Sequence, residues 1–252
     1  MSFSPRRFLA SPHGGPVELA ALAVLYGLYE LVRGFGSENW ETAFAHTADI
    51  VALEQRLSLY GERAIQEWAQ SIPALPSALG VLYIVLHFAA TSLVLVWVHR
   101  ARRSSFPVVR TTLIASTALA LVGYVLYPAA PPRLANLGFA DTVTEHAGLN
   151  LSSDLLGGLY NPIAAVPSLH FGYALLVGAA VAALARNRAV RVLGALYPAV
   201  MLFIIVATGN HFLFDAAAGG VVTVAGWLVA RRLVSTRAKA RSFGSHGAPV
   251  AA

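Results

Sequence analysis

The sequence predicts an all-α integral membrane protein: a bundle of six transmembrane helices with an amphipathic helical cap between spans one and two. Hydrophobic residues make up 57% of the chain and charged residues only 12%, and the mean hydropathy is +0.63. Soluble domains carry roughly 25% charged residues, so the composition excludes an ordinary soluble protein. The apolar residues also gather in runs of about 20 residues, the length that a helix needs to cross a bilayer.

Six apolar runs are the expected spans. They cover approximately residues 16–35, 78–98, 108–127, 166–185, 190–208 and 211–230. The first run is long enough to cross a bilayer and no small-residue cleavage site follows it, so we expect a span rather than a secretory signal. The predicted parts of the chain are a cytoplasmic head at 1–15, a membrane domain at 16–234 and a disordered basic tail at 235–252. The chain has no cysteine, which excludes disulfides.

The segment 37–71 differs from the spans because acidic and apolar residues alternate along it. Its six acidic residues are Glu38, Glu41, Asp49, Glu54, Glu62 and Glu67. This mixture predicts one or two amphipathic helices that lie on the membrane surface or cap the bundle. We expect a packing element without chemistry of its own. The second outer segment, the loop at 128–161, contains a long polar stretch at 136–161, which is either a lid or binding loop or a simple connection.

The basic residues orient the bundle. Fourteen of the 18 lysines and arginines flank one side of the predicted spans or lie in the two terminal segments. The positive-inside rule therefore places both termini in the cytoplasm of a multi-pass plasma-membrane protein. The net charge of +6 is a topology signal, so no nucleic-acid partner is expected. The two outer segments then face the periplasm or the exterior.

Polar residues mark the outer ends of two spans. The run Val166 to His170 opens the fourth span, and the run Gly209 to Asp215 opens the sixth. On a helix, the spacing of four residues puts His211 and Asp215 on one face, where a carboxylate can orient an imidazole. Arg133 lies in the loop that leads into the fourth span, on the same side of the membrane. Ionisable groups at membrane depth are functional by default, so we expect one site here.

The residue types predict a phosphate site. An arginine and two helix N-termini, with unpaired N–H groups, attract an anion. A neutral imidazole, His211, can attack phosphorus while Asp215 holds its tautomer, and His170 can protonate the departing oxygen. The phosphate is expected to bind to Arg133, Ser168 and Asn210. His87, near the middle of the second span, either supports the site or only packs there.

At these residues the chain resembles the type 2 phosphatidic acid phosphatase superfamily, which includes vanadium haloperoxidases. The run Pro167 to His170 is similar to the family's Pro-Ser-Gly-His motif, and His211 to Asp215 resembles the His-x-x-x-Asp end of another. Further short runs look like the aureobasidin-resistance, or inositol phosphorylceramide synthase-like, branch: Tyr127-Pro128, Pro131-Pro132-Arg133, Asn161-Pro162, Gly209-Asn210 and His87-Phe88 with Thr91.

The resemblance implies a lipid phosphatase or phosphotransferase that needs no metal or other cofactor. Its substrate is a lipid phosphate or lipid-linked phosphate, and a phosphohistidine passes the phosphoryl group to water or to an alcohol such as inositol. Two positions depart from the family pattern, because Leu126 and Ile205 stand where a lysine and an arginine are usual. Arg110 cannot replace either cation, since the predicted topology puts it on the cytoplasmic side.

Two other classes of protein stay open at this stage. A metal site could use His170, His211 and Asp215 as a two-histidine, one-carboxylate triad. That hypothesis gives Arg133 and the Pro-Ser-Leu-His context no role. Alternatively, the same groups could form the head-group site of a non-catalytic lipid binder or transporter. No internal repeat supports a transporter, and a pure binder does not need the His211–Asp215 pair.

Overall fold

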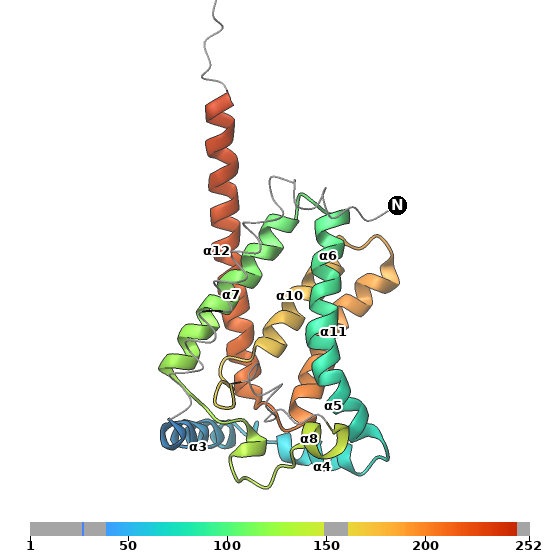
Figure 1. Ribbon diagram of the computed structural model, residues 1–252, viewed down its shortest axis with the longest axis vertical. Helices are drawn as coiled ribbons and strands as arrows, with labels where there is room; N and C mark the ends of the chain where they lie inside the picture. Colours follow the sequence, from blue (N-terminus) through green and yellow to red (C-terminus); the bar gives the residue numbers. More distant parts are fainter. Residues whose placement is uncertain (1–26, 28–38, 149–160, 246–252) are drawn as a thin grey trace, which may run out of the picture.

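The computed structural model describes residue 27 and residues 39–148 and 161–245. The predicted head, the first predicted span apart from residue 27, the end of the tail and residues 149–160 of the outer loop lie outside these ranges. Within them, every regular element is helical, and the only strand-like pairing is a single bridge between Ala129 and Ala164. The main helices run side by side as a bundle, and short helices cross one end of it (Figure 1).

Four of the described helices are long and apolar enough to cross a membrane. The first, Leu75–Ala101, consists of α5 (Leu75–Val85), the π-helical turn η1 (Leu86–Ala90) and α6 (Thr91–Ala101). The others are α7 (Phe106–Leu126), α11 (Arg188–Ala207) and the apolar part of α12, Leu213–Thr236. These four match predicted spans.

Helix α10 (Leu169–Leu184) stands where the fourth span is predicted, but it has only 16 residues. A perpendicular crossing of the hydrocarbon needs about 20 residues, so six full spans are not established. Helix α12 ends at Ser245, beyond the predicted domain boundary at 234. The tail therefore starts as a continuation of this helix, since alanine, arginine and lysine are good helix formers.

Small residues let the helices approach closely. A Cβ at Gly172 of α10 would lie 2.6 Å from Oγ1 of Thr223 in α12, so these two helices pack nearly backbone to backbone. Other glycines lie at the contacts of different pairs of helices. Gly178 of α10 faces α11, where its Cβ would meet the Gly194 carbonyl oxygen at 2.5 Å, and Gly226 of α12 faces Ser116 of α7.

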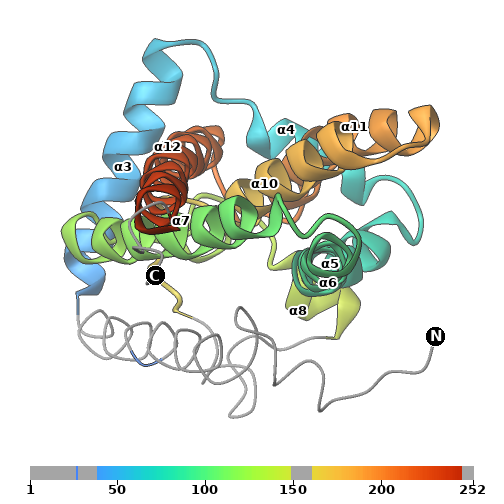
Figure 2. The same ribbon diagram turned by 90° about the horizontal axis from the view of Figure 1, so that it is seen from above.

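Helices α3 (Trp40–Arg56) and α4 (Glu62–Gln70) form the predicted cap across one end of the bundle (Figures 1 and 2). Their buried face is more polar than an amphipathic cap requires: it contains Thr47, Glu54, Glu62 and Gln66. The large apolar side chains Leu53, Leu57 and Trp68 are exposed instead. Loop and helix-end backbone groups under the cap need hydrogen-bond partners once they are buried, and the polar side chains of the cap supply them.

The outer loop lies under this cap. Thr47 of α3 both donates to the Ala130 carbonyl and accepts from the Ala130 amide, each at 3.0 Å. The loop then forms the 3₁₀ turn η2 (Pro132–Leu134) and the short helix α8 (Thr142–Ala147). Gln66 of α4 fixes Ala140, two residues before α8, because its side chain donates to the Ala140 carbonyl at 3.0 Å and accepts from the Ala140 amide at 2.9 Å.

Candidate active site

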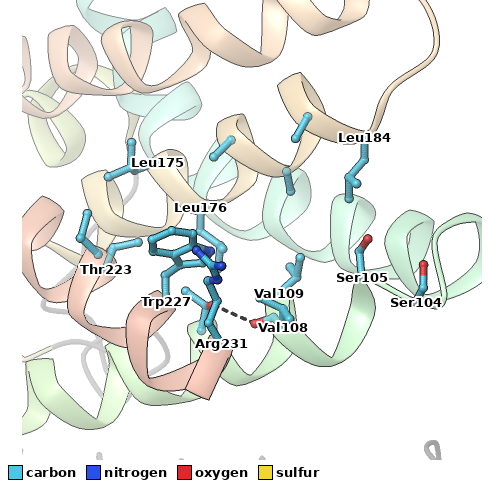
Figure 3. Close-up of a pocket in the computed structure, with 15 residues that line it drawn as sticks. Ser104, Ser105, Val108, Val109, Leu175, Leu176, Leu184, Thr223, Trp227 and Arg231 are labelled. Atoms are coloured by element: carbon cyan, nitrogen blue, oxygen red, sulfur yellow. Dashed lines mark hydrogen bonds between the residues drawn. The ribbon is translucent and has the colours of Figure 1, made fainter. Parts of the chain in front are cut away.

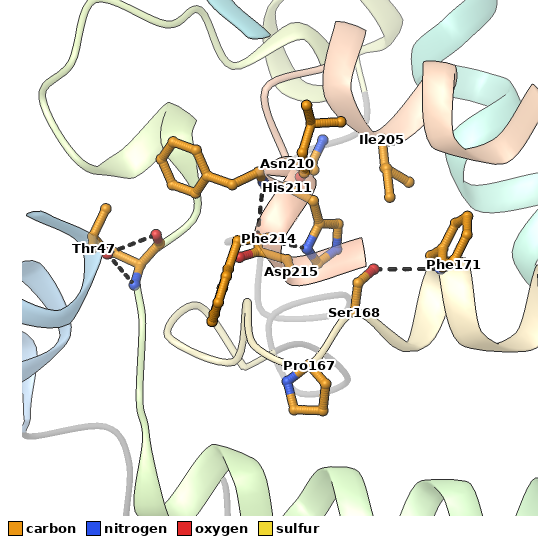
Figure 4. A network of polar contacts seen from close by, with 12 residues as sticks. Thr47, Pro167, Ser168, Phe171, Ile205, Asn210, His211, Phe214 and Asp215 are labelled. Carbon is orange, nitrogen blue, oxygen red and sulfur yellow. Dashed lines mark hydrogen bonds and ion pairs between the residues drawn. The ribbon is translucent and has the colours of Figure 1, made fainter. Parts of the chain in front are cut away.

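His211 and Asp215 form a buried pair at the start of α12. The Nδ1 atom of His211 lies 3.2 Å from Oδ2 of Asp215, and the two residues are 5% and 0% exposed (Figure 4). Asp215 Oδ2 also accepts a hydrogen bond of 2.9 Å from the Phe212 amide. Asp215 thus reaches back to the residue before the helix, as the third residue of a capping box does. Since the carboxylate occupies the Nδ1 side, Nε2 is the nitrogen of His211 that can meet a substrate.

His170 comes to the same place from the first turn of α10. Its ring centroid lies 5.6 Å from that of His211, and it stacks on Tyr83 at 4.2 Å. Ser168 starts this helix as its N-cap, because its Oγ accepts from the Phe171 amide at 3.3 Å. The Ser168 amide donates to the Asp215 carbonyl at 2.9 Å. The starts of α10 and α12 are therefore joined, and the two predicted histidines face each other.

His87 contacts His170 from η1. The two ring centroids lie 4.0 Å apart, and His87 also stacks against Tyr173 at 5.3 Å. The π-helical turn is held from α11, because the Tyr197 hydroxyl donates to the Leu86 carbonyl at 3.0 Å. Among the residues that the structure describes, no hydrogen-bond partner meets the buried Nδ1 of His87. π-Bulges of this kind are frequent at functional sites.

Arg133 is bound to the block that carries His211. Its amide donates to the Gly209 carbonyl and its Nε to Oδ1 of Asn210, each at 2.9 Å. Its NH1 donates to Asp141 at 2.7 Å, just before α8. Gly209 itself has φ +69°, and a Cβ there would lie 2.7 Å from the side-chain nitrogen Nε2 of Gln66. A close turn that favours glycine thus places Arg133 beside the His211 block.

Two of the predicted phosphate ligands have other partners in the structure. Asn210 is 1% exposed; it accepts from Arg133 and donates to Oγ1 of Thr208 at 3.0 Å. Ser168 is 0% exposed and caps α10. In this arrangement Asn210 orients Arg133, and Ser168 orients the helix that carries His170. Neither role was predicted from the sequence: the contact of Asn210 with Arg133 joins segments 77 residues apart, whereas the capping contact of Ser168 is local.

Two buried glutamates of the cap belong to the site and were missed as functional residues. Oε1 of Glu62 accepts from the Leu213 amide at 3.0 Å, and Oε1 of Glu54 accepts from the Phe214 amide at 2.7 Å. Burial and the adjacent Glu62 together raise the pKa of Glu54 to about 8. These contacts correct the expectation that the N–H groups of α12 are unpaired. With Asp215 on Phe212, carboxyl groups already occupy three successive amides, which leaves less room for a phosphate there.

Of the two positions that depart from the family pattern, Ile205 has a buried, well-defined environment. Ile205 is fully buried behind His211, and its carbonyl accepts from the Asn210 and His211 amides, each at 3.1 Å. Arg110 lies near the start of α7, at the end of the bundle away from the cap (Figure 1). In residues 39–148 and 161–245, no three His, Asp or Glu side chains are arranged to hold a metal ion. The arrangement of the described residues therefore does not favour the metal-triad hypothesis.

A cavity of about 610 Å³ lies elsewhere, between α7, α10 and α12 (Figure 3). Its lining is mostly apolar and includes Val109, Leu176, Ala180, Trp227 and Arg231. None of the predicted site residues lines it. The polar site near the cap is therefore separate from this cavity.

Together, the fold and the site define a class: a helical membrane protein with a buried His–Asp pair, a facing histidine and an arginine at one end of the bundle. The PAP2 superfamily profile matches residues 48–229, which is more than half of the chain, and the chain belongs to this superfamily. Its members are phosphatases, so membership indicates a phosphatase-type lipid phosphoesterase activity. Neither a curated protein nor a solved structure matches the chain significantly.

Proposed function

We propose that the protein is a membrane lipid phosphatase or phosphotransferase that works through a phosphohistidine on His211. It cleaves a phosphoester or diphosphate bond in a lipid or lipid-linked substrate. The observation that carries the proposal is the His211–Asp215 pair at 3.2 Å, which faces His170 with ring centroids 5.6 Å apart. A nucleophile, its orienting carboxylate and a second acid–base group therefore occur in one place, the arrangement that nucleophilic catalysis requires.

In the first half-reaction, Nε2 of His211 attacks phosphorus and the bond to the leaving oxygen breaks. His170 gives that oxygen a proton, and Asp215 stabilises the charge that develops on the His211 ring. In the second half-reaction, water or an alcohol attacks the phosphohistidine, and the phosphorus–nitrogen bond breaks. His170 takes the proton of the attacking oxygen, so both histidines return to their starting states.

Arg133 binds the phosphoryl oxygens in this scheme, and Asn210 holds the guanidinium at the correct angle. A forked guanidinium suits planar contact with two oxygens. Ser168 acts through the start of α10, and His87 supports the ring of His170. The acceptor is water or an alcohol such as inositol, as the resemblance to the inositol phosphorylceramide synthase-like branch suggests.

The positions of the basic residues support an outward-facing orientation of the site in the membrane. The basic residues at the α6–α7 turn, Arg100, Arg102 and Arg103, lie at the end of the bundle away from the cap (Figure 1). The positive-inside rule puts that end in the cytoplasm together with both termini. The site under the cap then faces the periplasm or the exterior across the plasma membrane.

The test is phosphate release by detergent-purified protein in the presence of EDTA. The substrates are phosphatidate, a lipid diphosphate and a polyprenyl diphosphate, each with and without inositol. His211→Ala should abolish release, whereas His99→Ala, which changes a histidine of α6 in edge-to-face contact with Phe106, should leave it intact. Products that form only with inositol identify a transferase. Equal activity of His211→Ala and wild type would refute the nucleophile assignment, and binding without turnover on any substrate would favour the lipid-binder class.

A further inference from the structure

We propose that Glu54 and Glu62 are positioning residues: through these two buried carboxyl groups, the extramembrane cap fixes the first turn of α12, and with it His211 and Asp215. This inference rests on the proposed function. It assigns the α3–α4 segment a part in catalysis, where the sequence alone predicts only a packing element.

The geometry joins the cap to the nucleophile through consecutive residues. The amides of Phe212, Leu213 and Phe214 donate in turn to Asp215 at 2.9 Å, Glu62 at 3.0 Å and Glu54 at 2.7 Å. The first amides of a helix lack partners within the helix, and a nearby side chain normally supplies one. Here two of the three acceptors come from positions 151 and 160 residues earlier in the chain. The residue directly before these amides is His211.

Helix α4 also holds the arginine half of the site. Gln66 lies one turn after Glu62, and its two hydrogen bonds to Ala140 fix the residue before Asp141. Asp141 in turn accepts from Arg133 at 2.7 Å. A single helix outside the membrane spans therefore positions both the nucleophile and its phosphate-binding cation, through side chains four residues apart that share a face.

The burial of the glutamates indicates more than ordinary helix capping. Glu54 and Glu62 are 2% and 0% exposed, and burying a carboxyl group is unfavourable unless it is hydrogen-bonded or protonated. Oε2 of Glu54 has no partner among the described residues. Because the pKa of Glu54 is raised to about 8, this carboxyl group carries a proton at neutral pH.

The charge near the site therefore depends on Glu54. The ionisable groups around it are Glu62 of α4, Asp215 of α12 and Tyr60 of the connection between α3 and α4. Below pH 8 the pair Glu54–Glu62 carries at most one negative charge. At higher pH, Glu54 ionises as well, and the added charge repels both Glu62 and an incoming phosphate. Phosphate binding should therefore weaken as Glu54 loses its proton.

The experiment compares substitutions that keep or remove the acceptor oxygen. Oε2 of Glu62 also accepts from the Gly61 amide at 2.9 Å. Glu62→Gln keeps one acceptor oxygen for the Leu213 amide, whereas Glu62→Ala keeps none. We expect kcat of Glu62→Ala to fall by about 10²-fold with a smaller change in KM, because misplacement of a reacting group by about 1 Å has effects of this size. Glu62→Gln should restore kcat to within about threefold of wild type. The matched control is Glu67→Ala, in the same helix, because its side chain is 61% exposed and pairs with Arg63.

Glu54→Gln gives a second test, the pH dependence of KM, which can be measured in a variant that stays folded. Its KM should stay constant from pH 7 to 9, whereas the KM of wild type should rise above about pH 8, the pKa of Glu54. Full kcat in a folded Glu62→Ala protein, or an equal rise of KM in Glu54→Gln, would overturn the inference.

A readout without turnover separates this inference from the proposed function. Diethyl pyrocarbonate modifies accessible imidazoles, and mass spectrometry of the peptide that contains His211 gives the rate. Glu62→Ala should increase that rate relative to Glu62→Gln, even if no lipid in the panel is a substrate. Unchanged modification would overturn the positioning role, whereas inactive wild-type protein with faster modification in Glu62→Ala would refute only the phosphatase assignment.

Discussion

Gly219 of α12 lies directly against the main chain of Ser168, the residue that starts α10. A Cβ at position 219 would overlap the Ser168 carbonyl. Because Ser168 caps the helix that carries His170, and its amide binds the Asp215 carbonyl, this contact sets the distance between the two histidines. The neighbouring Gly220 has no such constraint, since a Cβ there would meet its nearest atom, on the Phe171 ring, at 3.4 Å.

Gly219→Ala should therefore separate the starts of α10 and α12. We expect kcat/KM to fall by about 10²-fold, the size of effect that a displacement of about 1 Å produces, and the melting temperature to drop. Gly220→Ala is the matched control and should behave like wild type in both assays. Equal activity of the two variants would mean that the Ser168 contact does not position His170.

Asp215→Asn should reduce kcat strongly while the fold is retained. The amide can still accept from Phe212, but it cannot stabilise a positive charge on His211. Replacement of the orienting aspartate by asparagine in a catalytic triad lowers kcat by about 10⁴-fold, and we expect a loss of about 10³-fold or more here. Single-turnover phosphate release and the melting temperature should be measured together. A loss below about tenfold would show that Asp215 does not support the nucleophile.

Arg133→Lys should weaken substrate binding even though the charge is kept. A lysine cannot both donate to Oδ1 of Asn210, as the Nε of Arg133 does, and present a forked pair of donors. We expect KM to rise by about tenfold or more, a loss of the order reported for one charge-assisted hydrogen bond. The control is Arg63→Lys, which changes an exposed cap residue paired with Glu67. An unchanged KM would place the phosphate away from Arg133.

The stability of the protein should depend on pH through Glu54. The pKa of its carboxyl group is about 8 in the fold and 4.5 without the fold's influence. Between these values the folded state binds more protons, so the free energy of unfolding should fall as pH rises from about 5 to 8. Thermal unfolding in detergent should show this slope for wild type and a flatter one for Glu54→Gln. Parallel slopes would show that Glu54 is ionised at neutral pH.

His87→Phe distinguishes support of His170 from simple packing. A phenyl ring keeps the stack with His170 and Tyr173 but removes both ring nitrogens. We expect kcat to fall by about tenfold, within the usual range for loss of a group that assists proton transfer, and the pH profile of kcat to shift. An unchanged rate and profile would assign His87 to packing alone.

Patterns along the chain predicted the parts that depend on local spacing. Apolar runs of sufficient length located α7, α11 and α12, and the spacing of four residues located the His211–Asp215 pair. The facing of His170 and His211 followed from the assignment of both span ends to one side of the membrane. These predictions needed only helix geometry and the exclusion of charge from lipid.

The cap could not be understood in the same way. The mixture of acidic and apolar residues in 37–71 indicates helices with a polar and an apolar face, but it does not say which face is buried. In the structure Glu54 and Glu62 are buried, and Leu57 is exposed. The normal expectation, carboxylates toward water, fails because α12 offers amides that need acceptors. The partners lie at least 151 residues away, so no local pattern contains this information. The same holds for Asn210, whose contact with Arg133 spans 77 residues.

The pairing of the cap with α12 also has a consequence for biosynthesis. Glu54 and Glu62 leave the ribosome well before Leu213 and Phe214, which bind them. Until α12 is made, these two carboxyl groups lack the amides that satisfy them, and His211, the proposed nucleophile, is absent. We therefore expect a chain that stops before α12 to lack both the contacts of the cap and the proposed chemistry.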